Sequence, residues 1–351
     1  MQPPPSTTIP APLCRLALTA TLSVGGLASV VELPAQERAP VPANEWEVPW
    51  GAQDRPRDPY VAPDGSVFFV GQVGNYIARL DPKTGQFTRF EIDPGTHPHN
   101  LIIDARGQVW FAGNRNGMIG RLDPATGAIT RYPMPDPAVR DPHTLVFDAR
   151  GNIWFTAQQS DAVGHLDTRT GAIRLVRTGE RTRPYGIVID SEGRPWFDLF
   201  GTNRIGTIDP ATMEFTAHTL PNERTRPRRI ALTSDDVVWY GDYSRGYLGR
   251  LDPKTGQIVE YQMPGGAASL PYGMASDDKD RIWLAENGAN GTRLVGFDPK
   301  TKQFFSITEV GIPSNNTIRH MYFDRKTGLL WFGSDQGTVG RLEVSKPPST
   351  M

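Results

Sequence analysis

The chain has 351 residues, of which 38% are hydrophobic and 21% charged, a composition typical of a folded protein with a sizeable core. Its formal net charge of −1 gives no sequence-wide reason to expect nucleic acid or an acidic membrane surface as a partner. The single cysteine, Cys14, excludes a disulfide within the chain and a cysteine-based metal site.

The first 36 residues have the features of a secretory signal peptide. Arg15 precedes an apolar, small-residue run from Leu16 to Val31, and small residues follow around Ala35. This run is short for a bilayer span, although a retained single-pass anchor is the competing interpretation. We expect cleavage near Ala35 or Gln36, a spacer over 37–43, a periplasmic or secreted mature protein, and no membrane insertion after the signal is removed.

An aromatic pair such as Trp110-Phe111 recurs along the rest of the chain. Its first position repeats at intervals of 42–48 residues, at Phe68, Trp110, Trp154, Trp196, Trp239, Trp283 and Trp331. Within the second copy, four short strands are expected at 101–103, 108–112, 118–122 and 128–132, joined by tight turns. Seven such units predict an all-β fold over 44–344, a seven-bladed β-propeller of four-stranded antiparallel blades, followed by a tail at 345–351.

Two features of the repeat are interpreted as structural. The Asp-Pro-x-Thr-Gly element at Asp81, Asp123 and Asp252, with a variant at Asp298, resembles a metal-binding series only superficially. Asp, Pro and Gly at this spacing instead favour a tight turn, in which the Asp side chain bonds its own backbone. The recurring tryptophans are expected to pack between neighbouring sheets.

The chain ends predict how the ring closes. The seventh unit stops near Val344 and lacks its fourth strand, whereas Glu45–Trp50 precedes the first unit and has strand-like alternation. We expect this N-terminal strand to complete the last blade, because pairing removes an exposed sheet edge.

Polar residues gather at one phase of the repeat, where the first strand of each unit begins at the channel. In six units a Pro precedes the first strand, and the residue after it is Arg57, His99, His143, Tyr185, Arg228 or Tyr272; the equivalent residue of the last unit is Arg319. The following position includes Asp58, Arg229 and His320. Arg offers forked donors, and His and Tyr donate or move protons. One interpretation is a pocket for an anion or a carbonyl group. The alternative is a solvated rim of paired charges. The predicted ligand-binding residues are Arg57, His99, His143, Tyr185, Arg228, Arg229, Arg319 and His320.

Acidic residues are expected beside this mouth, at the end of the second strand. They are Asp198, Asp242 and Glu286, with Ser334 in the last copy. Glu286 is the best acid candidate, and together with Asp242 it could hold a divalent cation through oxygen ligands.

The repeated phrase Pro-x-x-(Ile/Leu)-x-x-Asp-x-x-Gly-x-x-Trp-Phe, followed by Ile-Gly-Arg-(Leu/Ile)-Asp-Pro-x-Thr-Gly, resembles the virginiamycin B lyase (streptogramin lyase) family over residues 44–344. The resemblance implies a magnesium-dependent elimination that opens a cyclic depsipeptide at its ester. It implies an active blade with Glu-x-His on strand one and a second Glu on strand two. Glu286 matches the second Glu, but Leu270 and Tyr272 stand at the other two positions. Arg228 stands where these lyases place another His, so streptogramins are not the expected substrate.

Three functions follow from this sequence. The first is a metal-assisted lyase acting on an ester or other anionic small molecule, with Tyr272 and Glu286 as catalytic residues and Mg²⁺ at Glu286 and Asp242. Tyr272 would need its pKa lowered by a neighbour such as Arg228 to act as a base. The second is a non-catalytic propeller that binds a small ligand or another exported protein. The third is a lactonase-like hydrolase, against which the seven units count.

Overall fold

The computed structural model describes residues 29–31, 39–288, 291–311 and 316–345. The predicted signal peptide and the C-terminal tail lie almost wholly outside these residues. Within the leader only β1 (Ser29–Val31) is described, and it pairs in parallel with β22. Among the described residues, no helix is both long and apolar enough to cross a bilayer.

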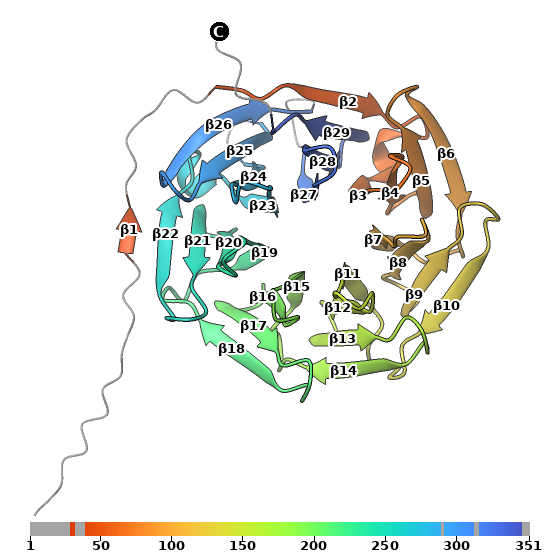
Figure 1. Cartoon of the computed structure of the whole chain (residues 1–351), viewed down its shortest axis with the longest axis horizontal. Helices are drawn as coiled ribbons and strands as arrows, with labels where there is room; N and C mark the ends of the chain where they lie inside the picture. The colour runs from red at the N-terminus through yellow and green to blue at the C-terminus, as the bar shows by residue number, and fades with distance from the viewer. Residues whose placement is uncertain (1–28, 32–38, 289–290, 312–315, 346–351) are drawn as a thin grey trace, which may run out of the picture.

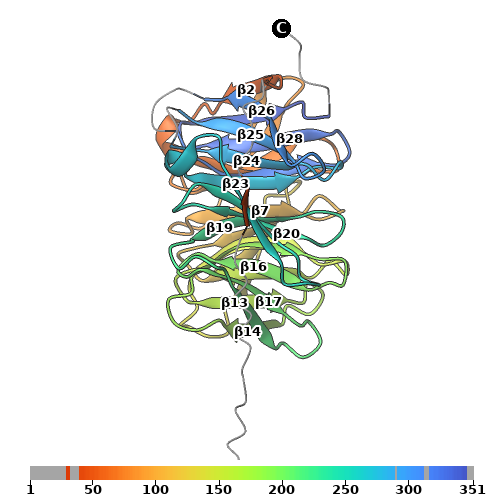
Figure 2. The same cartoon turned by 90° about the vertical axis from the view of Figure 1, so that its left-hand side faces the viewer.

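The described residues form a ring of seven four-stranded antiparallel blades around a central channel, which confirms the predicted propeller (Figure 1). Seen from the side, the ring is a disc (Figure 2). The innermost strands are β3 (Pro56–Val61), β7 (Pro98–Ile103), β11 (Pro142–Phe147), β15 (Pro184–Ile189), β19 (Pro227–Leu232), β23 (Pro271–Ser276) and β27 (Ile318–Asp324). We number the blades 1 to 7 in that order.

The second and third strands of each blade carry the repeated motif. The second strands are β4 (Val67–Gly71), β8 (Val109–Gly113), β12 (Ile153–Ala157), β16 (Pro195–Leu199), β20 (Val238–Asp242), β24 (Ile282–Glu286) and β28 (Leu329–Ser334). The third strands are β5 (Tyr76–Asp81), β9 (Met118–Leu122), β13 (Ala162–Leu166), β17 (Arg204–Ile208), β21 (Tyr247–Leu251), β25 (Arg293–Asp298) and β29 (Thr338–Leu342).

The outermost strands are half-exposed and polar. They are β6 (Gln86–Glu91), β10 (Ile129–Pro133), β14 (Ile173–Arg177), β18 (Phe215–Thr219), β22 (Ile258–Gln262), β26 (Gln303–Glu309) and, in blade 7, β2 (Ala43–Glu47). The helical elements of the described residues are two 3₁₀ turns, η1 (Ala52–Asp54) and η2 (Gly266–Ala268).

The ring closes as predicted, because β2 pairs antiparallel with β29 and supplies the fourth strand of blade 7. The strand is displaced from the expected Glu45–Trp50 and ends at Glu47. Its Trp46 stacks on Trp331 with ring centroids 5.8 Å apart, and the Glu45 carboxylate accepts a hydrogen bond from Thr338 Oγ1 at 2.7 Å. Trp50 lies beyond the strand and packs against Tyr76 and Phe87.

The core lies between neighbouring blades. The repeated tryptophans are buried, and Trp110 of blade 2 packs in one cluster with Leu145 and Phe155 of blade 3. The turn aspartates act locally, as interpreted: Asp123 Oδ1 accepts the backbone N–H of Ala125 at 2.9 Å, and Gly127 adopts a φ of 75° in the same turn.

Candidate functional site

A β-bulge at the start of every innermost strand aims two consecutive side chains at the channel. In blade 2 the pairing of β7 with β8 shifts between Pro98 and Leu101, so His99 and Asn100 lie within the bulge. The register also shifts at the start of the innermost strand in the other six blades, and in blade 1 it does so one residue later, between Arg57 and Tyr60. A bulge breaks the alternation of a strand, which is how neighbouring residues can both face one site.

The bulges build two layers of side chains across the channel. The first, which we call the mouth ring, consists of Arg57, His99, His143, Tyr185, Arg228, Tyr272 and Arg319. The second, the inner ring, consists of Asp58, Asn100, Thr144, Gly186, Arg229, Gly273 and His320. Six members of the mouth ring, all except Tyr272, line a cavity of about 250 Å³, the mouth cavity. Five members of the inner ring line a separate cavity of about 400 Å³: Asn100, Thr144, Gly186, Arg229 and His320. The inner ring therefore separates this lower cavity from the mouth cavity.

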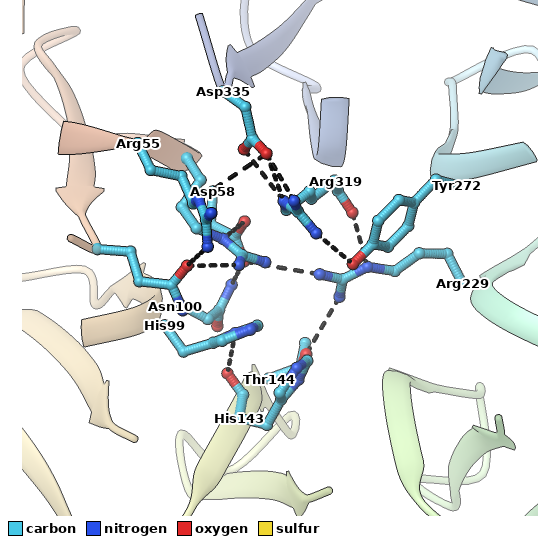
Figure 3. A network of polar contacts seen from close by, with 12 residues as sticks. Arg55, Asp58, His99, Asn100, His143, Thr144, Arg229, Tyr272, Arg319 and Asp335 are labelled. Carbon is cyan, nitrogen blue, oxygen red and sulfur yellow. Dashed lines mark hydrogen bonds and ion pairs between the residues drawn. The ribbon is translucent and has the colours of Figure 1, made fainter. Parts of the chain in front are cut away.

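Arg229 spans the channel and joins three other blades (Figure 3). Its Nη1 donates to Thr144 Oγ1 of blade 3 at 3.1 Å, and its Nε donates to the Arg319 carbonyl of blade 7 at 2.9 Å. Its Nη2 lies 3.8 Å from the buried carboxylate of Asp58 in blade 1. Gly186 leaves room for this residue, because a Cβ there would lie 3.3 Å from the Arg229 Cα.

Asp58 is the anionic centre of the inner ring. It accepts Arg57 Nε at 3.0 Å and Asn100 Nδ2 at 2.9 Å, and its own side chain is buried. Burial by itself would raise the pKa of Asp58, but Arg57, His320 and Arg229 outweigh burial and hold it well below its usual value. Asp58 therefore stays charged and compensates part of the arginine charge.

Two histidines in ring contact, tilted by 36°, form one side of the mouth cavity. The ring centroids of His99 and His143 are 3.5 Å apart. His99 Nδ1 lies 3.2 Å from the His143 carbonyl oxygen, and His143 Nδ1 lies 2.9 Å from Thr144 Oγ1. Burial, followed by the nearby arginines Arg57 and Arg229, lowers both pKa values well below the usual one. Both rings are therefore neutral near pH 7.

A tyrosine pair and an arginine surrounded by aromatic rings lie next to the histidines, and the ring centroids of Tyr185 and His143 are 4.1 Å apart. The hydroxyls of Tyr185 and Tyr272 contact each other, and Arg319 Nη1 donates to Tyr272 Oη at 3.4 Å. The Arg228 guanidinium lies 3.9 Å from the Tyr272 ring centroid, and the rings of Tyr243, Phe200 and Tyr185 also surround it. Such cation–π contacts stabilise a cation without neutralising it.

The two tyrosines titrate in opposite directions. Burial opposes ionisation of Tyr272, but Arg228 and Arg319 outweigh it and lower its pKa to about 8. Burial and the neighbouring Tyr272 raise the pKa of Tyr185 to about 12. Tyr185 is thus the hydrogen-bond donor of the pair, and Tyr272 is the member that loses its proton first.

Several buried donors of the site have no acceptor within the described part of the chain. They are Arg57 Nη2, Arg228 Nε, Arg229 Nη2 and His143 Nε2. Arg228 also lacks an ion-pair partner among the described residues. Asp198 does not supply one, because burial raises its pKa well above the usual value while it accepts the Gly186 N–H. Two further acids lie at the mouth. Asp141 lines the cavity and accepts the Ser160 N–H at 3.1 Å, and Asp335 is held by Arg319 Nη2 at 2.6 Å. The mouth is therefore cationic.

Residues 44–342 match the model of the Virginiamycin B lyase family. The chain belongs to this family. Its fold is similar to that of a streptogramin B lyase, with a TM-score of 0.76 and 26% identity over 86% of this chain and 97% of that chain. Virginiamycin B lyase from Staphylococcus aureus gives a TM-score of 0.76 and 23% identity over 86% of this chain and 98% of that chain.

The propeller is also shared more widely. The extracellular domain of a putative one component system from B. thetaiotaomicron has the same fold, with a TM-score of 0.63 and 19% identity over 88% of this chain and 43% of that chain. No curated protein matches the chain.

The magnesium that the virginiamycin B lyase family implies does not fit the carboxylates predicted to hold it. Glu286 Oε1 accepts the Gly265 N–H at 2.8 Å, and Glu286 Oε2 accepts Arg293 Nε. Asp242 Oδ1 accepts the Arg226 N–H at 3.0 Å, and Asp242 Oδ2 accepts Arg245 Nη1 at 3.2 Å. Each oxygen is thus engaged, and a cationic guanidinium stands beside each acid. Among the described residues, no group of three His, Cys, Asp or Glu side chains could hold a metal ion.

The predicted site residues separate into three groups. Six of them line the mouth cavity: Arg57, His99, His143, Tyr185, Arg228 and Arg319. Tyr272 does not line the cavity, but it contacts Tyr185 and Arg228. Arg229 and His320 lie in the inner ring and line the lower cavity. Glu286 and Asp242 are buried at the ends of β24 and β20, in ion pairs of their own blades.

Another set of mouth residues escaped the sequence analysis. The residue directly after the second strand reaches the mouth in most blades: Gln72, Asn114 and Gln158 line the cavity, Phe200 and Tyr243 surround Arg228, and Asp335 holds Arg319. These residues follow directly after Asp198, Asp242, Glu286 and their equivalents. Their repeat position is polar or aromatic in all seven copies, with Asn287 in blade 6, and this pattern is visible in the sequence. The strand turns toward the channel only after its last paired residue.

Proposed function

We propose that this protein binds a small anionic molecule, one that carries a carboxylate or a comparable oxyanion, in the mouth cavity. The observation that carries the proposal is the set of buried arginine nitrogens without an acceptor, Arg57 Nη2 and Arg228 Nε, at a cavity of about 250 Å³. A buried charged donor without a partner costs roughly 1–3 kcal/mol or more, and a ligand oxygen would remove that cost.

The chemistry of the donors favours an oxyanion over a neutral ligand. A guanidinium presents forked N–H groups that match carboxylate geometry, and hydrogen bonds between ions are about twice as strong as neutral ones. Arg228 is held in place by four aromatic rings rather than by an acid, so its charge is available to a ligand. The cavity volume lies at the small end of ligand pockets, which supports a small molecule.

Calorimetric titration with acetate, butyrate, succinate and sulfate at low ionic strength tests the proposal. We expect saturable binding, and we expect Arg228→Met to weaken it by about 10- to 100-fold, the loss of one charged hydrogen bond. Arg131→Met is the matched control, because Arg131 pairs with Asp93 on the outer surface. Arg57→Met provides a second variant if Arg228→Met does not fold. Absence of binding for all four anions, or equal binding by wild type and both mouth variants, would refute the proposal.

A second candidate function is β-elimination, in which the C–O bond that breaks lies at the carbon β to a carbonyl group and Tyr272 acts as the base. It is favoured by the pKa of about 8 for Tyr272, which leaves ~10% of the residue ionised at pH 7. In this step the phenolate oxygen takes a proton from the carbon beside the carbonyl. The C–H electron pair forms a C=C bond, and the C–O bond breaks with its electrons leaving on oxygen. Arg228 and Arg319 would stabilise the negative charge that develops.

This second function has a direct assay. Incubation with β-acyloxy and β-alkoxy carboxylates, followed by ultraviolet absorbance, detects a new conjugated C=C bond. Tyr272→Phe should abolish product formation while butyrate binding persists. No product from any substrate of this class would exclude the elimination and leave the binding function standing.

We also propose that the protein is exported, to the periplasm or the medium, after cleavage near Ala35 or Gln36. The leader composition supports this, and the N-terminal sequence of protein recovered from a fractionated bacterial host tests it. An intact N-terminus on cytoplasmic protein would contradict export.

A further inference from the structure

The ring nitrogens of His99 and His143 are not equivalent. His99 Nδ1 faces the carbonyl oxygen of His143 at 3.2 Å, and a carbonyl oxygen only accepts hydrogen bonds. Nδ1 of His99 must therefore carry the proton. Because the ring is neutral, Nε2 of His99 carries a lone pair, and among the described residues it has no hydrogen-bond partner.

His143 holds the opposite tautomer. Its Nδ1 lies 2.9 Å from Thr144 Oγ1, and that hydroxyl already accepts Arg229 Nη1 at 3.1 Å. The hydroxyl has one proton of its own, and His143 Nδ1 is its acceptor within the described part of the chain. The proton of the His143 ring therefore sits on Nε2, a buried atom without a partner among those residues.

The mouth cavity thus presents one acceptor and one donor side by side. Both histidines line it, and their ring centroids are 3.5 Å apart. A hydroxyl group has one proton and two lone pairs, so a single hydroxyl can donate to His99 Nε2 and accept from His143 Nε2–H. A carboxylate oxygen cannot do so, because it would face the His99 lone pair without a proton.

We propose that His99 and His143 recognise a hydroxyl group of the ligand, so that the ligand class is a hydroxy acid, sugar acids included. The inference rests on the proposed anion binding, with the arginines taking the carboxylate and the histidine pair taking the hydroxyl. His143 is 1% exposed, and its Nε2 is buried without a hydrogen-bond partner among the described residues. A ligand without the hydroxyl would leave this N–H group unpaired, which makes the recognition selective.

Calorimetric titration with butyrate and with its 2-, 3- and 4-hydroxy derivatives tests this inference, and gluconate extends it to a sugar acid. We expect at least one hydroxy acid to bind the wild type about tenfold or more tightly than butyrate does. His99→Phe and His143→Phe should reduce this preference to about twofold or less, measured for each variant as the ratio of its dissociation constants for butyrate and for the hydroxy acid. His218→Phe, which alters a histidine packed on Trp196 of the outer blade surface, should leave the preference unchanged.

The outcomes separate the two proposals. Equal affinity for butyrate and every hydroxy acid would overturn the hydroxyl inference and leave anion binding intact. Absence of binding for all of them, gluconate included, would remove both. A measurement on the wild type avoids dependence on variant folding: nitrogen-15 NMR of the imidazole rings should show a proton on Nδ1 of His99 and on Nε2 of His143. Any other tautomer pair would overturn the inference.

Discussion

Replacement of Arg229 by Met tests whether the inner ring braces the propeller. The variant keeps a side chain of similar length but removes the hydrogen bonds to Thr144 Oγ1 and the Arg319 carbonyl, as well as the ion pair with Asp58. Breaking a buried charged contact costs roughly 3–5 kcal/mol, because the partners lose solvation without compensation. Asp58 retains Arg57 and Asn100, so we expect about 3 kcal/mol of lost unfolding free energy, toward the lower end of that range.

The expected loss is measurable by urea unfolding and by calorimetry. For a domain of this size it corresponds to a melting temperature lower by about 5 °C. The surface variant Arg131→Met should leave the free energy of unfolding nearly unchanged, since both members of that ion pair are exposed. A double-mutant cycle with Asp58→Asn isolates the pair across the channel. A loss below about 1 kcal/mol for Arg229→Met would refute the idea that this residue ties the blades together.

Three further predictions concern closure, pH and metal. Deleting residues 1–40 should leave cooperative thermal unfolding intact, whereas deleting residues 1–50 removes β2 and should abolish it; equal behaviour of both truncations in calorimetry would contradict closure by β2. Burial, with Arg57 and Arg229, lowers the pKa of His99 and His143, so the unfolded chain takes up protons near pH 6.5 that the folded chain refuses. Stability should therefore fall as pH drops below about 6.5, and His143→Phe should weaken this dependence in urea titrations at about pH 7 and pH 5. The wild type must be compared with His143→Phe, because burial raises the pKa of Asp198, which makes stability rise as pH falls. An identical pH dependence of stability in His143→Phe and the wild type would contradict the role of His143. Neither magnesium nor chelator should shift the melting temperature, since Gly265 and Arg293 already engage Glu286; a magnesium-dependent rise that Glu286→Gln abolishes would contradict this.

Most of the fold could be predicted from the sequence repeat. Short strands of one length, separated by Asp-x-x-Gly and Asp-Pro-x-Thr-Gly turns, leave the chain only local antiparallel pairing, so blade number and strand order follow from counting. In blade 2 the observed strands begin within a few residues of the predicted ones. The closing strand was predictable for the same reason, because the seventh unit has only three strands and one further strand precedes the first unit.

The residues of the mouth ring were also predictable from the sequence, but the acids expected beside them lie in ion pairs of their own blades. Asp242 and Glu286 are expected beside the mouth because they stand at the end of the second strand. The structure shows the chain turning toward the channel one residue later, at Tyr243 in blade 5 and Asp335 in blade 7. Alternation of side chains ends where strand pairing ends, so the repeat position that is polar or aromatic in all seven copies faces the channel, and the acid before it does not.

By itself, the sequence determined the seven blades, the closing strand and the residue types that surround the channel, because these depend on local pairing and on the repeat period. Tertiary structure alone decided which of these residues meet. Arg229 reaches Thr144 across 85 residues of sequence and the Arg319 carbonyl across 90, since ring closure brings distant blades to one axis. The tautomers of His99 and His143, and the unpartnered nitrogen of Arg228, follow from those contacts and from burial. Distances across a closed ring are set by all of its blades together, and no single repeat contains them.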